Sequence, residues 1–317
     1  MNSNLTIVSG LWNISREDRT WSIYEEHFEN LLKTPCNMVL FIPKLLEDFV
    51  WQRRSKDNTY VRIYELEDIK NDMFKPFWDQ FQNIRLSPKW QNMTGESGWL
   101  KSSPQCTNQF YTPIQMSKMF FMHDAKIINP FNTDYFIWLD AGITQTVNAE
   151  HLYNPTVLNN LVDLIDPFLF LSFPYEAVNE IHGFDFAAMN RYAGKTVDYV
   201  CRGGLWGGHK DFISDAHGEY YGLVDATLSD GYMGAEECLF AIMAKRTPQH
   251  YRRCALPGHG LICHFTQELA NNTAKLEEIP KNTTHVKPIQ YDVSKLKTNL
   301  YMLTFNFPEQ PLHTINT

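Results

Sequence analysis

Hydrophobic residues follow two spacings along this chain, and together they predict strands that alternate with helices. Apolar or alternating runs of strand length occupy residues 5–11, 37–43, 60–66 and 134–140. A helix is predicted where apolar residues recur at helical spacing, at Trp21, Tyr24, Phe28 and Leu31. A capping box of Ser15 and Asp18 is expected to open that helix. Further helices are predicted at 45–52 and 112–127.

This order of elements predicts the fold class. Repeated strand, helix and strand favour an α/β fold with a mostly parallel central sheet flanked by helices, related to the Rossmann arrangement. Residues 85–108 are polar and rich in Ser, Pro, Gly and Asn, and they are too long for an ordinary connection. We interpret them as a mobile flap or a disordered insertion.

Composition narrows the class of protein. The chain has 317 residues, 44% of them hydrophobic, and a formal net charge of −8. The hydrophobic share is ample for a core, and the acidic balance disfavours a broad nucleic-acid surface, because phosphates are held by clustered Lys and Arg. Six scattered cysteines without CxxC pairs indicate neither a zinc site nor a disulfide framework.

The sequence carries no evident targeting signal. The N-terminus lacks the pattern of a signal peptide, and no run of about 18 apolar residues predicts a transmembrane segment. We therefore expect a cytoplasmic protein with reduced thiols, in which the glycosylation sequon at Asn92 stays unmodified.

An aspartate follows the apolar strand of the segment YFIWLDAGIT, residues 135–144. Open α/β sheets bind ligands beyond the carboxyl ends of their strands. Asp140 at such a place can coordinate Mg²⁺ or Mn²⁺ together with substrate phosphates. Ala141 and Gly142 would let a diphosphate approach the backbone. The alternative is a plain turn, in which Asp140 is a cap and Gly142 supplies a positive φ.

A glycine-rich segment, CRGGLWGGHKDF, occupies residues 201–212. It matches neither the Walker loop nor the GxGxxG fingerprint. Paired glycines would let the backbone wrap a flat ligand such as a sugar ring, with Trp206 as a stacking face. A tight bend beneath a core tryptophan is the alternative. The four glycines are Gly203, Gly204, Gly207 and Gly208.

Two adjacent carboxylates, Glu236 and Glu237, open a predicted helix. The helix dipole favours negative charge there, which alone explains both. Near a ligand crevice, however, such a carboxylate can bind sugar hydroxyls or act as a base. Adjacent helical residues point about 100° apart, so we expect one to face the site and the other solvent, and we prefer Glu237 for the site. Asp230 is a third candidate base.

Two histidines follow in the segment PGHGLICHFT, residues 257–266. His259 lies in a glycine-flanked turn, and His264 is expected in a short apolar strand. A single strand histidine is more often a structural residue than a metal ligand.

Several motifs, in their order and spacing, resemble the HtrL/YibB family. They are TIVSGLWNISREDR, PIQMSKMFFMHDAKIINPFNTDYFIWLDAGI, GGLWGGHKD and GAEECLF. The resemblance extends from about residue 5 to about residue 265. This family is similar to GT-A glycosyltransferases. The resemblance implies one GT-A-like domain over 1–270, with a nucleotide-binding half at about 1–145, an acceptor or sugar half at about 146–270, and a C-terminal extension at 271–317.

The resemblance also implies a reaction. A sugar would pass from a nucleoside-diphosphate sugar to an acceptor hydroxyl of a glycan or lipid-linked precursor. Asp140 would hold Mn²⁺ or Mg²⁺, but the Asp-x-Asp motif common in GT-A enzymes has Gly142 at its third position here. A late histidine often completes the metal shell in such enzymes, which implies His264, with His259 as the alternative.

Two arginines after the first strand, Arg16 and Arg19, would help to stabilise the departing diphosphate. The alternative is that they are a solvated helix start, although cations there oppose the dipole.

Two other functions are compatible with the sequence. One is a phage-type transferase acting on a hydroxymethylated DNA base, gripped by the basic stretches 52–56 and 245–254. The other is a non-catalytic protein that binds sugar nucleotides, which the missing second aspartate favours.

Overall fold

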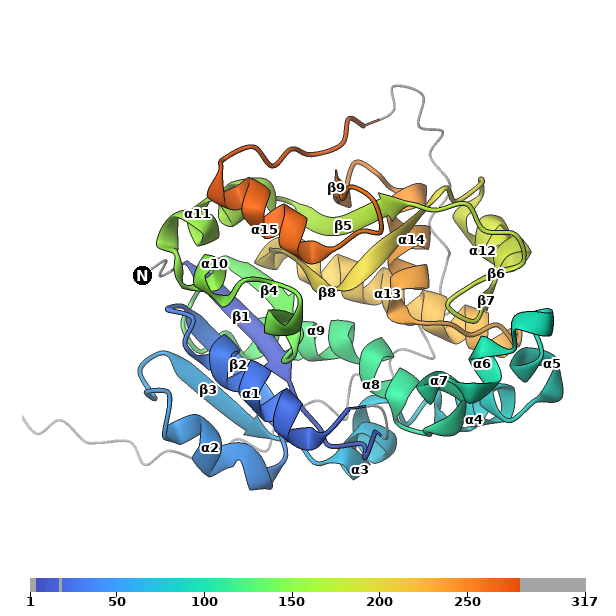
Figure 1. The fold of residues 1–317 in the computed structure, drawn as a ribbon, viewed down its shortest axis with the longest axis horizontal. Coiled ribbons are helices and arrows are strands. Elements are labelled where there is room, and N and C mark those ends of the chain that lie inside the picture. The colour runs from blue at the N-terminus through green and yellow to red at the C-terminus, as the bar shows by residue number, and fades with distance from the viewer. Residues whose placement is uncertain (1–3, 17–18, 280–317) are drawn as a thin grey trace, which may run out of the picture. The chain divides into compact units, whose positions relative to one another are not determined.

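The centre of the protein is a seven-stranded sheet (Figure 1). The computed structural model describes residues 4–16 and 19–279. The strands lie in the order β3, β2, β1, β4, β8, β5, β9. Their bounds are β1 Leu5–Gly10, β2 Asn37–Ile42, β3 Thr59–Ile63, β4 Tyr135–Leu139, β5 Phe168–Pro174, β8 Tyr199–His209 and β9 Arg252–Ala255. A separate hairpin consists of β6 Glu180–Ile181 and β7 Phe184–Asp185.

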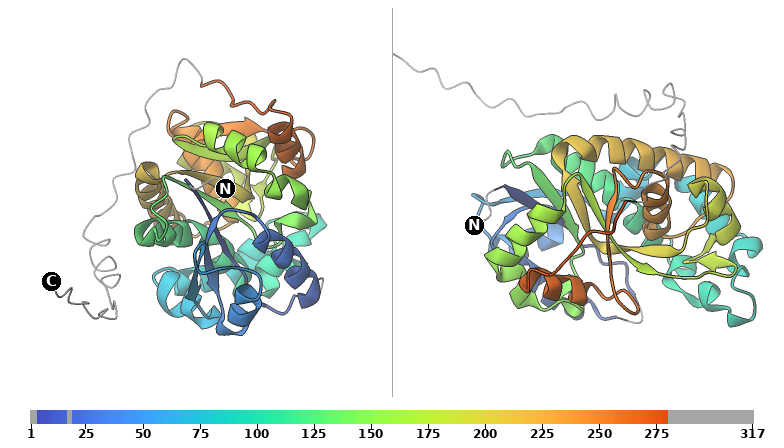
Figure 2. Two further views of the ribbon diagram at one scale, coloured as in Figure 1. Left: turned by 90° about the vertical axis from the view of Figure 1, so that its left-hand side faces the viewer. Right: turned by 90° about the horizontal axis from the view of Figure 1, so that it is seen from above.

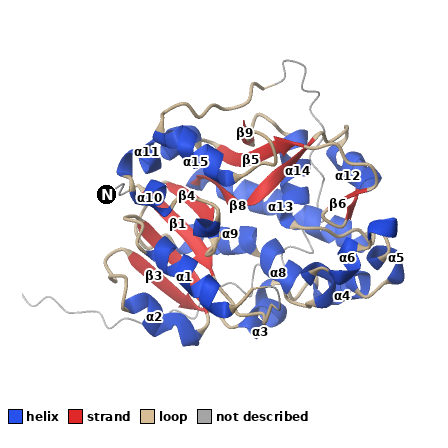
Figure 3. Cartoon of the chain, viewed as in Figure 1, coloured by secondary structure: helices blue, strands red, loops and turns tan. Residues whose placement is uncertain are grey.

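Helices cover both faces of the sheet, as Figures 2 and 3 show. On one face lie α9 Lys118–Ile128, α13 Lys210–Ser229 and α14 Glu236–Arg246. On the other lie α1 Trp21–Leu32, α10 Ala149–Tyr153, α11 Pro155–Leu164 and α15 Ile262–Ala270. The remaining helices are α2 Glu47–Trp51, α3 Leu66–Asp68, α4 Trp78–Arg85, α5 Pro88–Gln91, α6 Trp99–Ser102, α7 Pro104–Thr107, α8 Tyr111–Met116 and α12 Phe186–Ala193. Single 3₁₀ turns lie at Lys44–Leu46, Gly95–Ser97 and Ile143–Gln145, and a π turn lies at Ile69–Met73.

Strand directions confirm the predicted fold class and add one feature. β1 pairs in parallel with β2 and β4, β2 with β3, and β5 with β9. β8 runs antiparallel to both of its neighbours, β4 and β5. The fold is therefore an α/β fold with a mostly parallel sheet, and its glycine-rich strand is the one that runs the other way.

The first predicted helix begins later than the sequence suggested. α1 starts at Trp21 with Thr20 as its N-cap residue. Ser15 has a φ of 53° and its amide donates to Asn13 Oδ1, so it is not the first residue of a capping box. Asp18 lies outside the described residues. Ser15 and Arg16 thus belong to a loop.

The prediction for residues 85–108 was wrong, because this segment folds into short helices. α5, α6 and α7 occupy half of it, and Trp90 and Leu100 are buried. The Trp90 indole donates to Gly183 O at 2.9 Å in the turn of the β6–β7 hairpin. A few large apolar residues in a polar stretch therefore anchor it.

The predicted helix 112–127 is divided in two. α8 ends and α9 begins on either side of Ser117, which is buried. This break makes Lys118 the first residue of α9.

The alternative interpretation of the glycine-rich segment, a tight bend, was wrong, because Gly203 to Gly208 lie within the strand β8. The described residues 4–16 and 19–279 belong to one compact unit, and the predicted extension 271–317 lies outside the described residues from position 280 onward. The six cysteines are free, which agrees with the absence of a disulfide framework. Among the residues that the structure describes, no helix has the length and apolar character needed to cross a bilayer.

Candidate functional site

A cavity of about 690 Å³ lies beyond the carboxyl ends of β1 and β4. Its walls are the loop after β1, the first turns of α1, the loop after β4 and residues 260–262. β1 and β4 are neighbouring parallel strands, so their carboxyl ends meet at one edge of the sheet. This is the place where open α/β sheets bind ligands.

Asp140 follows β4 and borders this cavity, with a side chain 40% exposed. Its Oδ1 accepts a hydrogen bond from Trp138 Nε1 at 2.6 Å and lies 2.8 Å from Lys118 Nζ. The Asp140 amide donates to Gly204 O at 3.0 Å, which joins the end of β4 to β8. These contacts fix the carboxylate through Oδ1, and none of them uses Oδ2.

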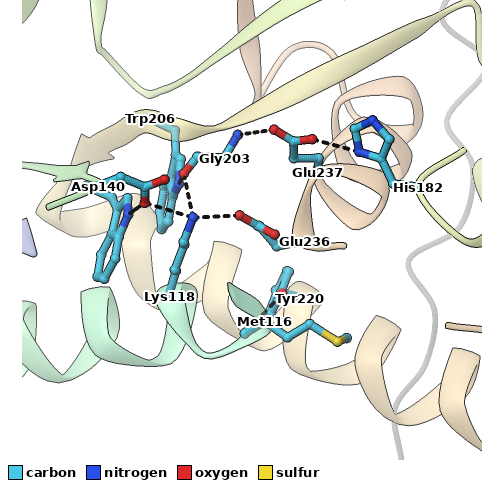
Figure 4. A network of polar contacts seen from close by, with 10 residues as sticks. Met116, Lys118, Asp140, His182, Gly203, Trp206, Tyr220, Glu236 and Glu237 are labelled. Atoms are coloured by element: carbon cyan, nitrogen blue, oxygen red, sulfur yellow. Dashed lines mark hydrogen bonds and ion pairs between the residues drawn. The ribbon is translucent and has the colours of Figure 1, made fainter. Parts of the chain in front are cut away.

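Lys118 places a buried positive charge at the centre of the site. Its Nζ lies 2.8 Å from both Asp140 Oδ1 and Glu236 Oε1, and 3.2 Å from Gly203 O (Figure 4). An ammonium group has three donors, so these acceptors engage all of them. Burial would lower the pKa of Lys118, but the two carboxylates outweigh it and raise the pKa. Lys118 is therefore a charged residue that positions Asp140 and Glu236.

A second pocket, of about 280 Å³, adjoins the cavity, and Asp140, Lys118 and Glu237 line both. Glu237 Oε1 accepts the Gly203 amide at 2.8 Å, and its Oε2 lies 2.8 Å from His182 Nδ1. Figure 4 shows His182 and Lys118 on opposite sides of the two glutamates. The pocket is thus lined by three carboxylates, a lysine and a histidine.

The two glutamates differ in their protonation behaviour. Burial raises the pKa of Glu236 above its usual value, against the opposing effect of Lys118. Burial acts on Glu237 in the same direction, but the hydrogen bond and charge of His182 and the Gly203 amide outweigh it and lower its pKa. Glu236 Oε2 is buried without a hydrogen-bond partner among the described residues. Glu237 is therefore the firmly ionised member of the pair.

The prediction that one glutamate faces the site and the other solvent was wrong. The Glu236 side chain is 2% exposed and that of Glu237 is 16% exposed, and both line the smaller pocket. Gly203 makes this possible, because a Cβ atom there would overlap Glu236 Oε1 and lie 3.3 Å from Glu237 Cγ. The strand comes close enough to the helix start for both carboxylates to meet it.

Positive charge gathers on the larger cavity. Arg16, Arg19, Arg202 and Lys118 line it, against the carboxylates of Asp140 and Glu237. Arg19 Nη1 donates to Gln145 Oε1 at 2.7 Å, and the Arg16 guanidinium lies 5.2 Å from the centre of the Tyr111 ring. A chain that is acidic overall therefore presents an excess of cations here.

Comparison with known proteins identifies the family. The model of the family HtrL_YibB, described as "Bacterial protein of unknown function (HtrL_YibB)", matches residues 1–252. The chain belongs to the HtrL/YibB family. A search of the curated proteins gives no match.

Solved structures similar to this HtrL/YibB chain include two enzymes. One is the Mn/GDP form of core-mannan synthase A from Aspergillus fumigatus, with a TM-score of 0.46, 11% identity, and coverage of 91% of this chain and 80% of the other. The other is 4-diphosphocytidyl-2C-methyl-D-erythritol synthase from Anaerococcus prevotii DSM 20548, with a TM-score of 0.31, 10% identity, and coverage of 75% and 94%. At these TM-scores the likeness says nothing about the activity of this chain.

The structure places part of the glycine-rich segment of this HtrL/YibB protein away from the cavity. Trp206 is fully buried and stacks between Trp138 and Phe168, so it offers no face to a sugar. A Cβ atom on Gly207 would overlap Phe136 O, and one on Gly208 would lie 2.7 Å from Pro167 O. These two glycines admit neighbouring backbone, whereas Gly203 and Gly204 line the smaller pocket.

Three other predicted site residues of the HtrL/YibB chain lie elsewhere. Asp230 is the C-cap residue of α13. Its side chain is 57% exposed, and its carboxylate accepts a hydrogen bond from the Tyr192 hydroxyl at 2.6 Å. His264 lies on the helix α15, not on a strand, and both His264 and His259 are exposed and do not line the cavity. Within residues 4–16 and 19–279, no three His, Cys, Asp or Glu side chains form a metal-binding group. The structure therefore does not bring His264 to Asp140.

Two residues of the HtrL/YibB site were missed at the sequence level. Lys118 stands between Met116 and Met119, and a lysine in such an apolar helix is a signal for a buried charge. His182 precedes Gly183 between two short apolar stretches, which is the pattern of a tight hairpin turn.

Proposed function

We propose that this HtrL/YibB protein is a glycosyltransferase that moves a sugar from a nucleoside-diphosphate sugar to an acceptor hydroxyl. One observation carries the proposal: a cation-rich cavity and a carboxylate-rich pocket adjoin each other, with Asp140 on the border of both. A diphosphate requires positive charge around it, and the departing group gains negative charge as the sugar leaves. The reacting carbon would lie between the two.

The cavity offers suitable partners for a nucleotide. Arg16 and Arg19 come from the loop before α1, and would contact the phosphates. Trp21 and Tyr24 on α1 also line the cavity and would contact the base or ribose. Ala141 and Gly142 line it beside Asp140 and keep the approach to the backbone open. Gly204 faces the same space from β8.

A divalent metal fits this site if a single protein carboxylate and the phosphates of the donor hold it together. Mg²⁺ held with nucleotide phosphates uses only one or two protein carboxylates, and the available donor is the hard oxygen Asp140 Oδ2. Asp140 together with the donor phosphates would hold Mn²⁺ or Mg²⁺, which neutralises charge on a leaving diphosphate. His264 is no longer part of this proposal. The chain's own cations, Arg16 and Arg19, would bind and orient the same phosphates.

The DNA-base alternative gains no support from the basic stretches. Arg54 is used within the protein, where its guanidinium donates to the carbonyls of Leu32 and Thr34 at 2.8 Å. Lys245 pairs with Asp198 at 2.7 Å, and the side chain of Arg246 is 6% exposed. Such residues are poorly placed to grip a phosphate backbone.

The proposal is tested by donor binding. Thermal shift of the full chain would be measured with a panel of UDP-, GDP-, ADP- and dTDP-sugars, with and without Mn²⁺. We expect one of these nucleotide sugars to raise the melting temperature and Asp140→Asn to abolish the Mn²⁺-dependent part of the rise. Asp134→Asn is the matched control, because Asp134 precedes β4, is also 40% exposed and also pairs with a lysine, Lys210 at 2.6 Å.

Two results would contradict the proposal. One is the absence of a shift with every nucleotide sugar in the wild-type chain. The other is equal donor binding by wild type, Asp140→Asn and Asp134→Asn, which would return Asp140 to the role of a turn residue.

A further inference from the structure

A histidine that the proposed reaction has not yet used stands in the smaller pocket. His182 lines this pocket together with Asp140, Glu237 and Trp99. Its Nδ1 lies 2.8 Å from Glu237 Oε2, and no described residue hydrogen-bonds its Nε2. A histidine tied to a carboxylate through one nitrogen presents the other for proton transfer.

The backbone holds His182 in an uncommon conformation. It has a φ of 49° and the following Gly183 a φ of 84°, and these two residues form the turn between β6 and β7. Two-residue hairpin turns with both φ values positive strongly prefer Asn, Asp or Gly at the first position. A histidine there carries backbone strain of the kind that gathers at functional sites.

Neighbouring segments fix this turn from outside. The Trp90 indole donates to Gly183 O at 2.9 Å, and the Gly183 amide donates to Glu180 Oε2 at 2.8 Å. The Trp99 indole donates to Glu180 Oε1 at 3.2 Å. The helices α5 and α6 therefore hold a hairpin whose turn carries the imidazole to the pocket.

Glu237 completes a dyad with His182. Its Oε1 is engaged by the Gly203 amide and its Oε2 by His182, so both oxygens have assigned partners. Its lowered pKa makes it a weak base, but an effective orienter of the ring. The arrangement repeats the base-and-orienter half of a catalytic triad: a carboxylate selects the tautomer with a proton on Nδ1 and leaves Nε2 to accept another.

We propose that His182 is the general base that takes the proton from the acceptor hydroxyl, with Glu237 as its positioning residue. This inference rests on the proposed glycosyltransferase function. The acceptor oxygen forms a bond to the anomeric carbon, its proton passes to His182 Nε2, and the bond from that carbon to the diphosphate breaks, with the electron pair leaving on the diphosphate.

The pocket also indicates the class of acceptor. Trp99 supplies an aromatic face on its wall, and Gln105 and Gln115 supply amide groups. A sugar ring presents both apolar C–H faces and hydroxyls, which suits an aromatic wall with amide partners. We therefore place a carbohydrate hydroxyl in this pocket, next to the dyad.

A pH dependence follows from the groups that face His182. Glu237 and Glu236 face it from α14, Arg202 from β8, and Glu180 lies on its own hairpin. Burial acts to lower the pKa of His182, but the hydrogen bond and charge of Glu237 outweigh it and raise the pKa above 6.5. A base must be unprotonated to act, so transfer should rise with pH across a step above 6.5.

The test compares His182→Asn with wild type in the full chain. Asn tolerates a positive φ, so the turn is kept while the base is lost. The probe is the nucleotide sugar that binds best in the donor panel, with methyl glycosides or water as acceptors, and release of nucleoside diphosphate is measured. We expect donor binding by calorimetry to be unchanged, transfer to fall about 10²–10⁴-fold, and the pH step to disappear.

Two further variants sharpen the result. His182→Gly suits the backbone and leaves room for added imidazole, which should restore part of the lost activity. Glu237→Gln should shift the pH step to lower values, because the carboxylate that raises the imidazole pKa is gone. His264→Asn, at an exposed histidine away from both pockets, is the matched control.

The inference fails if His182→Asn transfers within threefold of wild type, or keeps the pH step. It also fails if imidazole does not raise the activity of His182→Gly while that variant still binds the donor. A failure of the proposed glycosyltransferase function would be recognised separately, because the wild-type chain would then bind no nucleotide sugar of the donor panel.

Discussion

Lys118 shows how much of the site depends on a single residue. Its ammonium group is shared by Asp140, Glu236 and a carbonyl of β8, all in a place where water is nearly excluded. Without this charge, Glu236 would be a buried carboxylate with no counterion. Removing one partner of a buried pair is far more damaging than replacing both.

This predicts a large loss of stability for Lys118→Met. We expect the free energy of unfolding at pH 8 to fall by about 3–5 kcal/mol, measured by urea denaturation. In this variant the folded-state pKa of Glu236 rises further above that of the unfolded chain, so the folded state binds more protons. Stability then falls as pH rises through the folded pKa, and the loss should be smaller at pH 5 than at pH 8.

A double variant and a control complete this experiment. Lys118→Met with Glu236→Gln should recover much of the lost stability, since no unpaired buried charge remains. Lys126→Met, on the same helix but at a part-buried hydrogen bond to Ser214, should cost only about 1 kcal/mol. Equal losses for Lys118→Met and Lys126→Met would contradict the central role of the ammonium.

At the residue scale, the sequence indicated some residues of the candidate site and missed others. Asp140 was predictable because it ends an apolar strand, and Glu237 because it begins an apolar helix. Lys118 and His182 carried only local signals, of a buried charge and of a hairpin turn. Their place in the site was not predictable, because each contacts partners far away in the chain. A hydrophobic pattern reports which side of an element is buried, and it does not report which distant charge meets it there.

Among the elements, β8 departs most from its sequence signal. Glycine in a strand weakens it and often marks a close approach of backbone. In β8 other groups do come this close. The side chains of Glu236 and Glu237 pack against Gly203, and the backbone of β4 packs against Gly207. The same composition that suggested a ligand-wrapping segment therefore serves partly for packing, and only the neighbouring strands show which glycines do so.

We predict that Gly207→Ala prevents stable folding. The added Cβ would overlap Phe136 O, a backbone atom of a central strand that cannot move aside. Soluble yield and urea denaturation would measure the effect. The matched control is Gly218→Ala in α13, where no atom lies within 4 Å of the added Cβ, and where alanine should stabilise the helix by up to about 1 kcal/mol. A stable Gly207→Ala protein would mean that β4 and β8 can separate at little cost.

The segment 85–108 illustrates the opposite error. Its polar composition suggested disorder, yet Trp90 and Leu100 are buried and the indole of Trp90 is hydrogen-bonded. Average composition overlooks a few large side chains when they are anchors. Here those anchors also hold the turn that carries His182.

At the scale of the whole molecule, acid should destabilise this protein through a pair of half-buried histidines. His123 and His217 stack with ring centres 4.1 Å apart and planes 11° apart, between α9 and α13. Burial, with a smaller effect from Lys126, lowers the pKa of His123 to about 4, and burial with His123 lowers that of His217 to about 3. Both rings are neutral in the folded chain.

The sign of the effect follows from these values. The unfolded chain takes up protons on both histidines below pH 6.5, whereas the folded chain does not until about 4 and about 3. Their contribution to stability is therefore complete above pH 6.5 and is lost as the pH falls. Each histidine adds a slope of up to about 1.4 kcal/mol per pH unit.

Replacing one member of the pair tests this prediction. His217→Phe keeps an aromatic ring and removes the titration, so the free energy of unfolding should depend less steeply on pH between 6.5 and 4. His264→Asn, an exposed histidine, should leave the slope of the wild type. If His217→Phe and wild type show the same slope, acid unfolding starts elsewhere.

The sequence predicted the fold class well because the alternation of strands and helices is local and strongly patterned. β1, β2, β3 and β4 were all located within a few residues. The direction and position of β8 were not predictable, since pairing between distant strands leaves no periodic signal. The cavity lies beyond the ends of parallel strands, where the sequence predicted a ligand site. The part of the pocket wall that comes from the β6–β7 hairpin was not predicted.

The position of β8 has a consequence for how this chain reaches its folded state. β4 leaves the ribosome before α10, α11, β5 and α12, and only then does β8 enter between β4 and β5. Until that moment both strands present unpaired edges, and joining them requires contacts between distant parts of the chain, which form slowly. Such edges can pair with other chains. Synthesis of this protein therefore passes through a stage in which the facing edges of β4 and β5 are open to pairing with other chains.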